Sequence, residues 1–516
     1  MTSGINMSFE FGGAKRDGPS PEPVESGELF RVLVLGDFSG RASRLHEQLA
    51  APSFAPVTVD LDRFDAVLQG LSVALDLRLP QSPDVPVRIR LSSFDDFEPD
   101  ALFAQLPLFA KLRDLRKRLA DPATFEQAAA DMRADDAAVT SVGGSAALDG
   151  PAGAEDDATT LHRLLGAAPI AAEPAQRGPP GGVDAAVDRL LRRVVAPFVV
   201  PATSHLQQPM IESIDRAISE TMCGILRNPH WRALEGNWRA LDQFTRTVEM
   251  DGQVLLELVD ASAADVLSSL STAEGDTART PLAKKLAARR LHEGQEEGYA
   301  VLVAMYEFGP SAAELALLAG LGALAAGEGA VLLGAAAAEL ALVDAPDAWD
   351  GAVPMLTDSQ AQARWRAMRT SWVAPHIGLV WPNVMARLPY GAKTQPVSSF
   401  AFEELGATAV QAELPWRCAA LDLASLLART FTEAGWDMQS RLAVELEDLP
   451  AFVDDRGDSP HLQAVAELYM SQRQAQAVAA AGIMPLISHR TLPHARLATW
   501  RSIGAAEPEL KARWQA

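Results

Sequence analysis

The 516-residue sequence is poor in cysteine: it contains Cys223 and Cys418, too few for a disulfide framework or a tetrahedral zinc site. Such low usage fits a reducing compartment. The first residues lack a basic stretch followed by an apolar core, so they do not resemble a secretory signal. No apolar run reaches the roughly 20 residues of a membrane span, because glutamates interrupt the most apolar region, residues 312–343. These absences predict a cytoplasmic protein without membrane insertion.

Positive charge is also scarce, with 45 basic against 67 acidic residues and a net charge of −22. A surface this negative repels a phosphate backbone or an anionic membrane, so nucleic acid and lipid are poor partners. Assembly with copies of itself stays possible, because charge can be segregated by face. The length predicts two to four domains rather than one core.

Catalytic and ligand-binding motifs are missing as well. Residues 30–41 read FRVLVLGDFSGR, in which Phe38 stands between Gly36 and Gly40. The stretch therefore lacks the Gly-x-Gly-x-x-Gly dinucleotide fingerprint. It is better explained as a strand that ends in a polar turn. YGAKT at 390–394 has alanine where a P-loop needs glycine. There is no HExxH or CxxC, and the acidic clusters 95–96 and 445–448 are explained as solvated faces. We therefore expect no catalytic, cofactor-binding or metal site, and no enzyme.

The patterns that are present predict an α/β chain with four parts. Residues 1–27 contain an alternating strand at 5–13, with Phe9 and Phe11, followed by a Pro/Glu/Gly spacer. From the residues alone this strand either pairs with the edge of another sheet or is a frayed terminus. Residues 28–133 form a small α/β unit, in which a helix over 101–120 packs one face against the sheet. Residues 134–182 are an Ala/Gly/Pro-rich linker.

The fourth part, residues 183–516, alternates helices and strands. Apolar runs at 254–260, 298–308, 330–337 and 377–383 predict strands, and helices between them predict crossovers in a partly parallel sheet. Trp231, Leu234, Trp238 and Leu241 share one helical face, where the tryptophans are core or interface anchors rather than a ligand box. Beyond residue 390 we predict a helix near 423–435 among irregular segments.

The order of these segments resembles a known family. Residues 30–41, 57–71, 87–102 and 112–125 resemble the small subunit of the type VI secretion contractile sheath. Residues 214–244, 298–336, 377–404 and 482–490 resemble its large subunit, most specifically in Leu-Glu-Gly-x-Trp at 234–238 and Leu-Pro-Tyr-Gly at 388–391. The chain resembles a natural fusion of the two subunits that ends without the large subunit's C-terminal domain.

The resemblance implies a non-enzymatic structural role without a cofactor. In this family, protomers stack in helical rings around an inner tube, exchange β-strands with their neighbours and are disassembled by an AAA+ ATPase. The resemblance therefore implies a homo-oligomer or co-assembly with other sheath subunits, and contact with the inner tube protein. Baseplate components and the AAA+ ATPase are further candidate partners. Strand 5–13 then becomes an exchange strand. An accessory protein that caps, adapts or regulates assembly is the alternative. The expected interface or structural residues are Phe9, Phe11, Asp37, Trp231, Leu234, Gly236, Trp238, Pro389 and Tyr390.

Overall fold

The computed structural model describes residues 29–44, 49–80, 82–131, 187, 191, 207–250, 252–271, 277–293, 298–341, 358–406, 411–455 and 460–515. The expected exchange strand with Phe9 and Phe11, and the expected linker at 134–182, lie outside the described residues. We call residues 29–131 the first segment and residues 207–515 the second segment.

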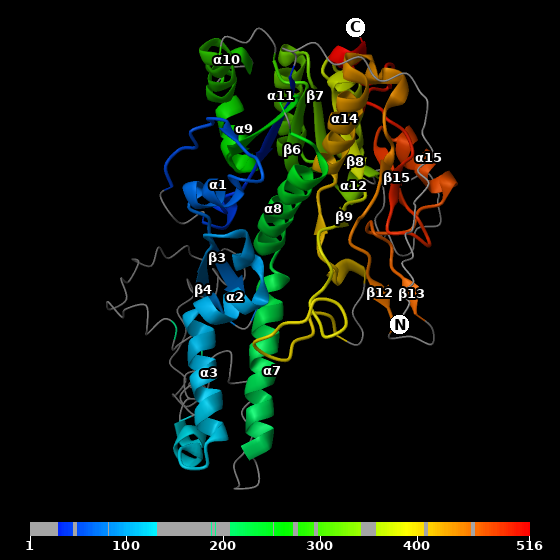
Figure 1. Ribbon diagram of the computed structural model, residues 1–516. Helices are drawn as coiled ribbons and strands as arrows, with labels where there is room; N and C mark the ends of the chain where they lie inside the picture. Colours follow the sequence, from blue (N-terminus) through cyan, green and yellow to red (C-terminus); the bar gives the residue numbers. More distant parts are fainter. Residues whose placement is uncertain are drawn as a thin grey trace, which may run out of the picture.

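A nine-stranded mixed sheet is the centre of the described structure (Figure 1). Six neighbouring strands are parallel, which confirms the predicted partly parallel sheet. In spatial order the strands are β11 (Glu445–Leu446), β15 (Ala495–Leu497), β14 (Met484–Ser488), β8 (Ile377–Trp381), β7 (Val331–Ala336), β6 (Val301–Phe308), β1 (Phe30–Gly36), β5 (Val254–Asp260) and β2 (Val57–Thr58).

Strand β1 of the first segment lies inside the sheet of the second segment. Val32 pairs with Leu256 of β5 on one side and with Val301 of β6 on the other, both in parallel register. The expectation that the first segment packs around a sheet of its own is therefore wrong. Strand β2 of the first segment also joins this sheet, as the antiparallel edge partner of β5. Its remaining strands, β3 (Ala74–Leu79) and β4 (Ser82–Arg90), form a separate antiparallel pair. The local pattern of a strand does not specify a partner more than 200 residues away.

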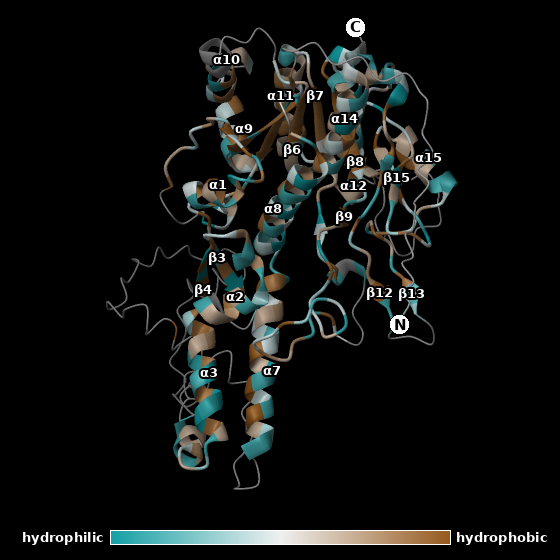
Figure 2. Ribbon diagram, viewed as in Figure 1, coloured by the Kyte–Doolittle hydropathy of each residue, from teal (hydrophilic) through white to brown (hydrophobic). Residues whose placement is uncertain are grey.

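Two apolar cores cover the two faces of the sheet, and alternate residues of β1 point into each of them. Val32 and Val34 belong to the core that contains α8 (Pro229–Thr247) and α14 (Ala420–Ala434). Leu33 and Leu35 belong to the core that contains α9 (Ala263–Ser271), α11 (Ala312–Glu328) and α13 (Ser359–Arg369). Strand β7 is accordingly apolar along its length, and β6 is apolar from Val301 to Met305 (Figure 2). Because both faces are buried, these strands are continuous apolar runs rather than alternating ones.

The helix expected over 101–120 is two helices, α2 (Pro99–Gln105) and α3 (Pro107–Ala120). Pro107 has no backbone N–H to continue α2, and it occupies the first turn of α3. The expectation that this helix packs against its own sheet is also wrong. Helix α3 instead lies beside α7 (Gln207–Leu226), away from the large sheet (Figure 1). Arg116 pairs with Asp215 at 2.5 Å, and Gln207 Nε2 donates to the Leu119 carbonyl at 2.8 Å.

The remaining elements are short or peripheral. Strands β14 and β15 were not expected from the sequence, which predicted irregular structure there. The other helices and strands are α1 (Phe64–Leu71), α10 (Pro281–Glu293), α12 (Ala338–Ala341), α15 (Gln472–Ala480), β9 (Val384–Met385), β10 (Trp416–Arg417), β12 (Val453–Asp454) and β13 (His461–Leu462). Within the described ranges, no helix combines the length and the apolar composition needed to cross a membrane.

Candidate functional site: a buried junction between the two segments

Helix α8 of the second segment packs against the first segment and carries four of the nine expected interface or structural residues. It begins at Pro229, and the Asn228 side chain caps it by accepting from the His230 N–H at 3.0 Å. Trp231, Leu234 and Trp238 are buried on one face, as the helical spacing predicts. We call the contact between this face and the first segment the junction.

Both tryptophans of α8 contact aromatic residues of the first segment. The Trp238 indole N–H donates to the Phe38 carbonyl at 2.9 Å, and its ring meets the Phe38 and Phe64 rings edge-on at 5.6 and 5.4 Å between centroids. The Trp231 ring lies 5.5 Å from the ring of Phe97. Edge-to-face packing of this kind is favourable beyond the area it buries. The junction is thus a continuation of the core rather than a loose domain contact.

The turn that follows β1 is held by carboxylates. Asp37 accepts from the N–H groups of Arg41 and Ala42 at 2.8 and 2.7 Å. Asp260, at the end of β5, accepts from the N–H groups of Phe38 and Ser39 at 2.8 and 3.0 Å. The amides that a phosphate-binding loop would offer are therefore already bonded, and the interpretation of this stretch as a structural turn is confirmed.

Gly40 is required in this turn. Its φ is +78°, and a Cβ there would lie 2.3 Å from the Ala74 carbonyl oxygen. The turn can consequently close against the start of β3, where the Ala74 N–H donates to the Ser39 carbonyl at 3.2 Å.

A buried charge cluster links α8 to the loop after β9. Its members are Glu235, Arg239, Arg387, Tyr390 and Glu404. Arg387 donates to Glu235 at 2.6 Å through Nε and to Glu404 at 2.6 Å through one terminal nitrogen. All three of these charged side chains are buried. Such a cluster is tolerated in a core only because each charge has an opposite partner at hydrogen-bond distance.

Two further bonds extend the charge cluster. Arg239 donates to Glu235 at 2.8 Å and to the Tyr390 hydroxyl at 3.1 Å. It also reaches Glu98 of the first segment at 3.3 Å. The guanidinium of Arg387 stacks over the Tyr390 ring, 4.1 Å from its centroid. The cluster therefore joins α8, the loop around Tyr390 and the first segment in one network.

The pKa values of Glu235 and Arg387 depend on the opposite charges that surround each of them. Burial raises the pKa of Glu235, but the adjacent positive charges of Arg387 and Arg239 reverse this effect and lower the pKa to about 2. Burial likewise lowers the pKa of Arg387, and Glu235 and Glu404 more than compensate, raising that pKa well above its ordinary value. Both groups are thus held in their charged forms.

Two of the expected residues of the second segment contact this network: Tyr390 through Arg239, and Trp231 through Glu235. The motif around Trp238 and the motif around Tyr390, far apart in the sequence, contact each other through Glu235, Arg239 and Tyr390. Gly236 faces β10, where an added Cβ would lie 3.0 Å from the Arg417 Cβ. The Pro389 carbonyl accepts from the Thr394 hydroxyl at 2.5 Å. An intermolecular role for the named residues stays a prediction.

The central charges of the cluster were not among the expected residues. Glu235 had a usable signal, because it lies on the same helical face as Trp231 and Trp238, where a carboxylate needs a buried partner. Arg387 and Glu404 follow no periodic pattern, and their positions depend on loop conformation. Nothing in their local sequence distinguishes them from solvated charges.

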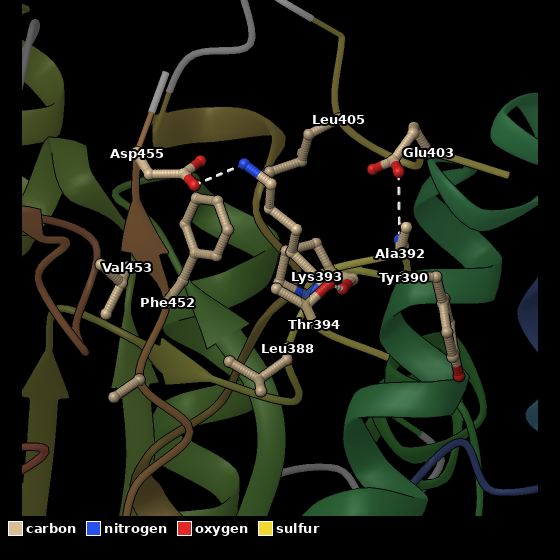
Figure 3. A pocket seen from close by; sticks show the side chains of 12 residues that line it. Leu388, Tyr390, Ala392, Lys393, Thr394, Glu403, Leu405, Phe452, Val453 and Asp455 are labelled. Carbon is tan, nitrogen blue, oxygen red and sulfur yellow. Dashed lines mark hydrogen bonds and ion pairs between the residues drawn. The ribbon is translucent and has the colours of Figure 1, made fainter. Parts of the chain in front are cut away.

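A surface pocket of about 530 Å³ borders the charge cluster at Tyr390 (Figure 3). The P-loop-like stretch lines one side, and the residues around β12 line the other. Lys393 reaches across to Asp455 at 2.5 Å, and the Ala392 N–H donates to Glu403 at 3.0 Å. Tyr390 extends away from Lys393 toward α8 (Figure 3). Lys393 and the Ala392 amide of this stretch are thus paired within the protein.

The fold and the junction define an α/β protein in which two segments are held together by buried aromatic and ionic contacts. Residues 208–503, more than half of the chain, match the family described as EvpB/VC_A0108, tail sheath N-terminal domain. Residues 23–135 match the family described as type VI secretion system, VipA, VC_A0107 or Hcp2. The chain belongs to the type VI secretion tail sheath family and carries both sheath segments in one polypeptide, as the sequence resemblance indicated.

A curated relative agrees with this assignment. The chain is 28% identical over 314 residues to the type VI secretion system sheath protein TssC1 of Pseudomonas aeruginosa strain PAO1. The match covers 57% of this chain and 62% of the relative. The chain therefore spans less than two thirds of the length of the curated relative it matches.

Proposed function

We propose that this protein is a structural component of a type VI secretion contractile sheath, in which the small and large subunits are one chain. The observation that carries the proposal is the position of β1, between β5 and β6 of the second segment. A strand held by parallel neighbours on both sides makes the two family segments a single folding unit. The protein would thus enter an assembly as a preformed protomer with fixed stoichiometry.

In this proposal the protein works through its surfaces and not by converting a substrate. The buried charge cluster supports it, because both of its carboxylates, Glu235 and Glu404, are bonded to arginine. Partners would be further copies or other sheath subunits, the inner tube protein, baseplate components and an AAA+ ATPase. The family assignment supports the first of these partners. A cytoplasmic location belongs to the same proposal.

Negative-stain electron microscopy of the purified full chain tests the proposal. A sheath subunit is expected to form long hollow tubules, alone or when mixed with inner tube protein. Discrete particles of fixed size under both conditions would favour the accessory role instead. A chain that stays monomeric and does not bind tube or sheath components would contradict assembly altogether.

A further inference from the structure

Helix α3 concentrates positive charge in a chain that is strongly negative overall. It carries Lys111, Arg113, Arg116, Lys117 and Arg118 against a single acidic residue, Asp114, whereas the whole chain has a net charge of −22. Two of these cations pair with neighbours: Arg116 with Asp215, and Arg118 with Asp131. Arg113 and Lys117 give α3 a positive face that the family assignment does not explain.

A pocket of about 490 Å³ lies on this face, between α3, α7 and residues 399–401. Arg113 borders it, with its guanidinium 5.0 Å from the centre of the Phe103 ring. Lys117 also borders it, is exposed, and has no ion pair within the part of the chain that the structure describes. Since Asp215 balances only Arg116, the lining has an excess of two positive charges. Its lining residues are Phe103, Arg113, Arg116, Lys117, Ala120, Asp215, Ile218, Ser399, Phe400 and Ala401.

The sequence next to this pocket has the opposite charge. Residues 134–161 contain no lysine or arginine. Their acidic residues are Asp135, Asp136, Asp149, Glu155, Asp156 and Asp157. This acidic stretch begins within 15 residues of the end of α3 and is opposite in charge to the pocket.

The chain that leads into this stretch lies beside the C-terminal end of α3, where Lys117 and Ala120 line the pocket. The described chain runs without a break as far as Asp131, which pairs with Arg118 in the last turn of α3. Gln207, at the start of α7, donates to the carbonyls of Leu119 and Ala120 in the same turn. An extended chain spans about 3.3–3.6 Å per residue, so Asp135 and Asp136 can reach one to two turns of α3 from Asp131.

We propose that the acidic segment 134–157 binds the basic pocket of α3, with its carboxylates placed against Lys117 and Arg113. A tether this short gives the segment an effective concentration on the order of mM at the pocket. Weak individual ion pairs are then sufficient for occupancy. This contact goes beyond the sheath assignment, and any other anionic partner of α3 would have to displace the segment.

A competition experiment on the full chain tests the proposal. In one variant the six carboxylates of 134–157 are replaced by the corresponding amides, which leaves the pocket intact and removes the tethered competitor. A fluorescently labelled synthetic peptide of residues 134–157 is titrated with this variant and with the native chain, and anisotropy reports binding. We expect the amide variant to bind the peptide at least about tenfold more tightly than the native chain does. Added salt should weaken binding, because the contact is ionic.

Charge reversals in the amide variant locate the binding site. Lys117→Glu should weaken peptide binding at least about tenfold, because an attraction becomes a repulsion. Lys111→Glu lies on the same helix outside the pocket lining and serves as the matched control, and circular dichroism verifies that each variant is folded. Absence of peptide binding, equal binding by native and amide chains, or equal loss for Lys117→Glu and Lys111→Glu would overturn the proposal. So would a native dimer that Lys117→Glu dissociates, because the occupant would then be a second copy.

Discussion

At the scale of single residues, the junction depends on charges that have been removed from water. Glu235 and Arg387 are buried and bonded at 2.6 Å, and Arg239 bonds the same carboxylate at 2.8 Å. A buried pair of this kind contributes little over an apolar equivalent, but losing one member strands the other charge in the core. The cluster therefore fixes which loop can lie against α8 and penalises other arrangements.

Replacing the central carboxylate should be strongly destabilising. We expect Glu235→Gln to lower the free energy of unfolding by about 3 to 5 kcal/mol, because Arg387 and Arg239 lose their shared counter-charge. Asp242→Asn, on the same helix, is the matched control, because the Asp242–Arg246 pair is solvent-exposed on its arginine side and should contribute less than about 1 kcal/mol. Urea titration followed by circular dichroism measures both. Equal effects of the two substitutions would argue against a structural role for the cluster.

The same carboxylate predicts how stability depends on pH. Burial raises the pKa of Glu235, but Arg387 and Arg239 lower it to about 2, well below the value of an unfolded glutamate. A carboxylate whose pKa is lower in the folded state than in the unfolded state stabilises the fold at pH values above its unfolded-state pKa. This stabilisation is lost as the pH falls toward the folded-state pKa. We expect this contribution, about 3 kcal/mol, to disappear between about pH 4.5 and pH 2. Urea titrations across this range should show a shallower pH dependence for Glu235→Gln than for the native chain, and parallel curves would contradict the assignment.

Sequence patterns could identify the apolar residues of the junction but not its charges. Trp231 and Trp238 repeat at helical spacing, and burial of that face follows from the hydrophobic effect. Glu235 could have been found as a carboxylate on an apolar face. Arg387 and Glu404 could not, because their partner is brought near only by the tertiary fold.

At the scale of elements, α8 is the helix through which the two segments contact each other. Its tryptophans face Phe38, Phe64 and Phe97 of the first segment, whereas Gly236 lets the helix approach β10. One helix thus packs against the end of β1 and against the elements that follow it. Changes on its buried face should affect both segments together.

A conservative substitution isolates the hydrogen bond of this helix. Trp238→Phe keeps a ring in the core but removes the indole N–H that the Phe38 carbonyl accepts. We expect a loss of about 1 to 3 kcal/mol in unfolding free energy, because that carbonyl is left buried without its donor. Trp372→Phe is the control, because Trp372 is 71% exposed and its replacement should change stability by less than about 0.5 kcal/mol. Thermal and urea denaturation measure both, and similar losses would show that the bond is unimportant.

The strands show where prediction from sequence ends. The apolar runs of β1, β5, β6, β7 and β8 were recognised, because strands buried on both faces are continuously apolar. Their order was not, because pairing of β1 with β5 joins residues more than 200 positions apart. Strands β14 and β15 are short and contain or follow proline, so local patterning gave little indication of them. Pro107 could have predicted the break between α2 and α3, because a proline usually ends a helix or begins a new one. The prediction of a single helix over 101–120 ignored this signal.

At the scale of the whole molecule, the covalent link between the segments is distinct from their noncovalent contact. Strand β1 has parallel partners on both sides, α3 lies along α7, and Asp100 accepts from the N–H groups of Ser398 and Ser399 at 3.0 and 2.7 Å. These contacts are spread over the length of the first segment. They would hold it in place if the chain between the segments were cut, because removing an interior strand exposes both of its neighbours and two apolar cores.

Cleavage of the chain between the segments tests this argument. A recognition sequence for a site-specific protease is inserted between Gly150 and Pro151, and the purified protein is cut under native conditions. We expect both fragments to elute together in size-exclusion chromatography at the volume of the uncut chain, and to separate only in denaturant. The link would then set stoichiometry and assembly rate, because it raises the local concentration of the two segments, without being needed for their contact. Separation of the fragments in native buffer would instead show that the shared sheet persists only while the chain is continuous, and the protomer would then depend on its fusion for stability.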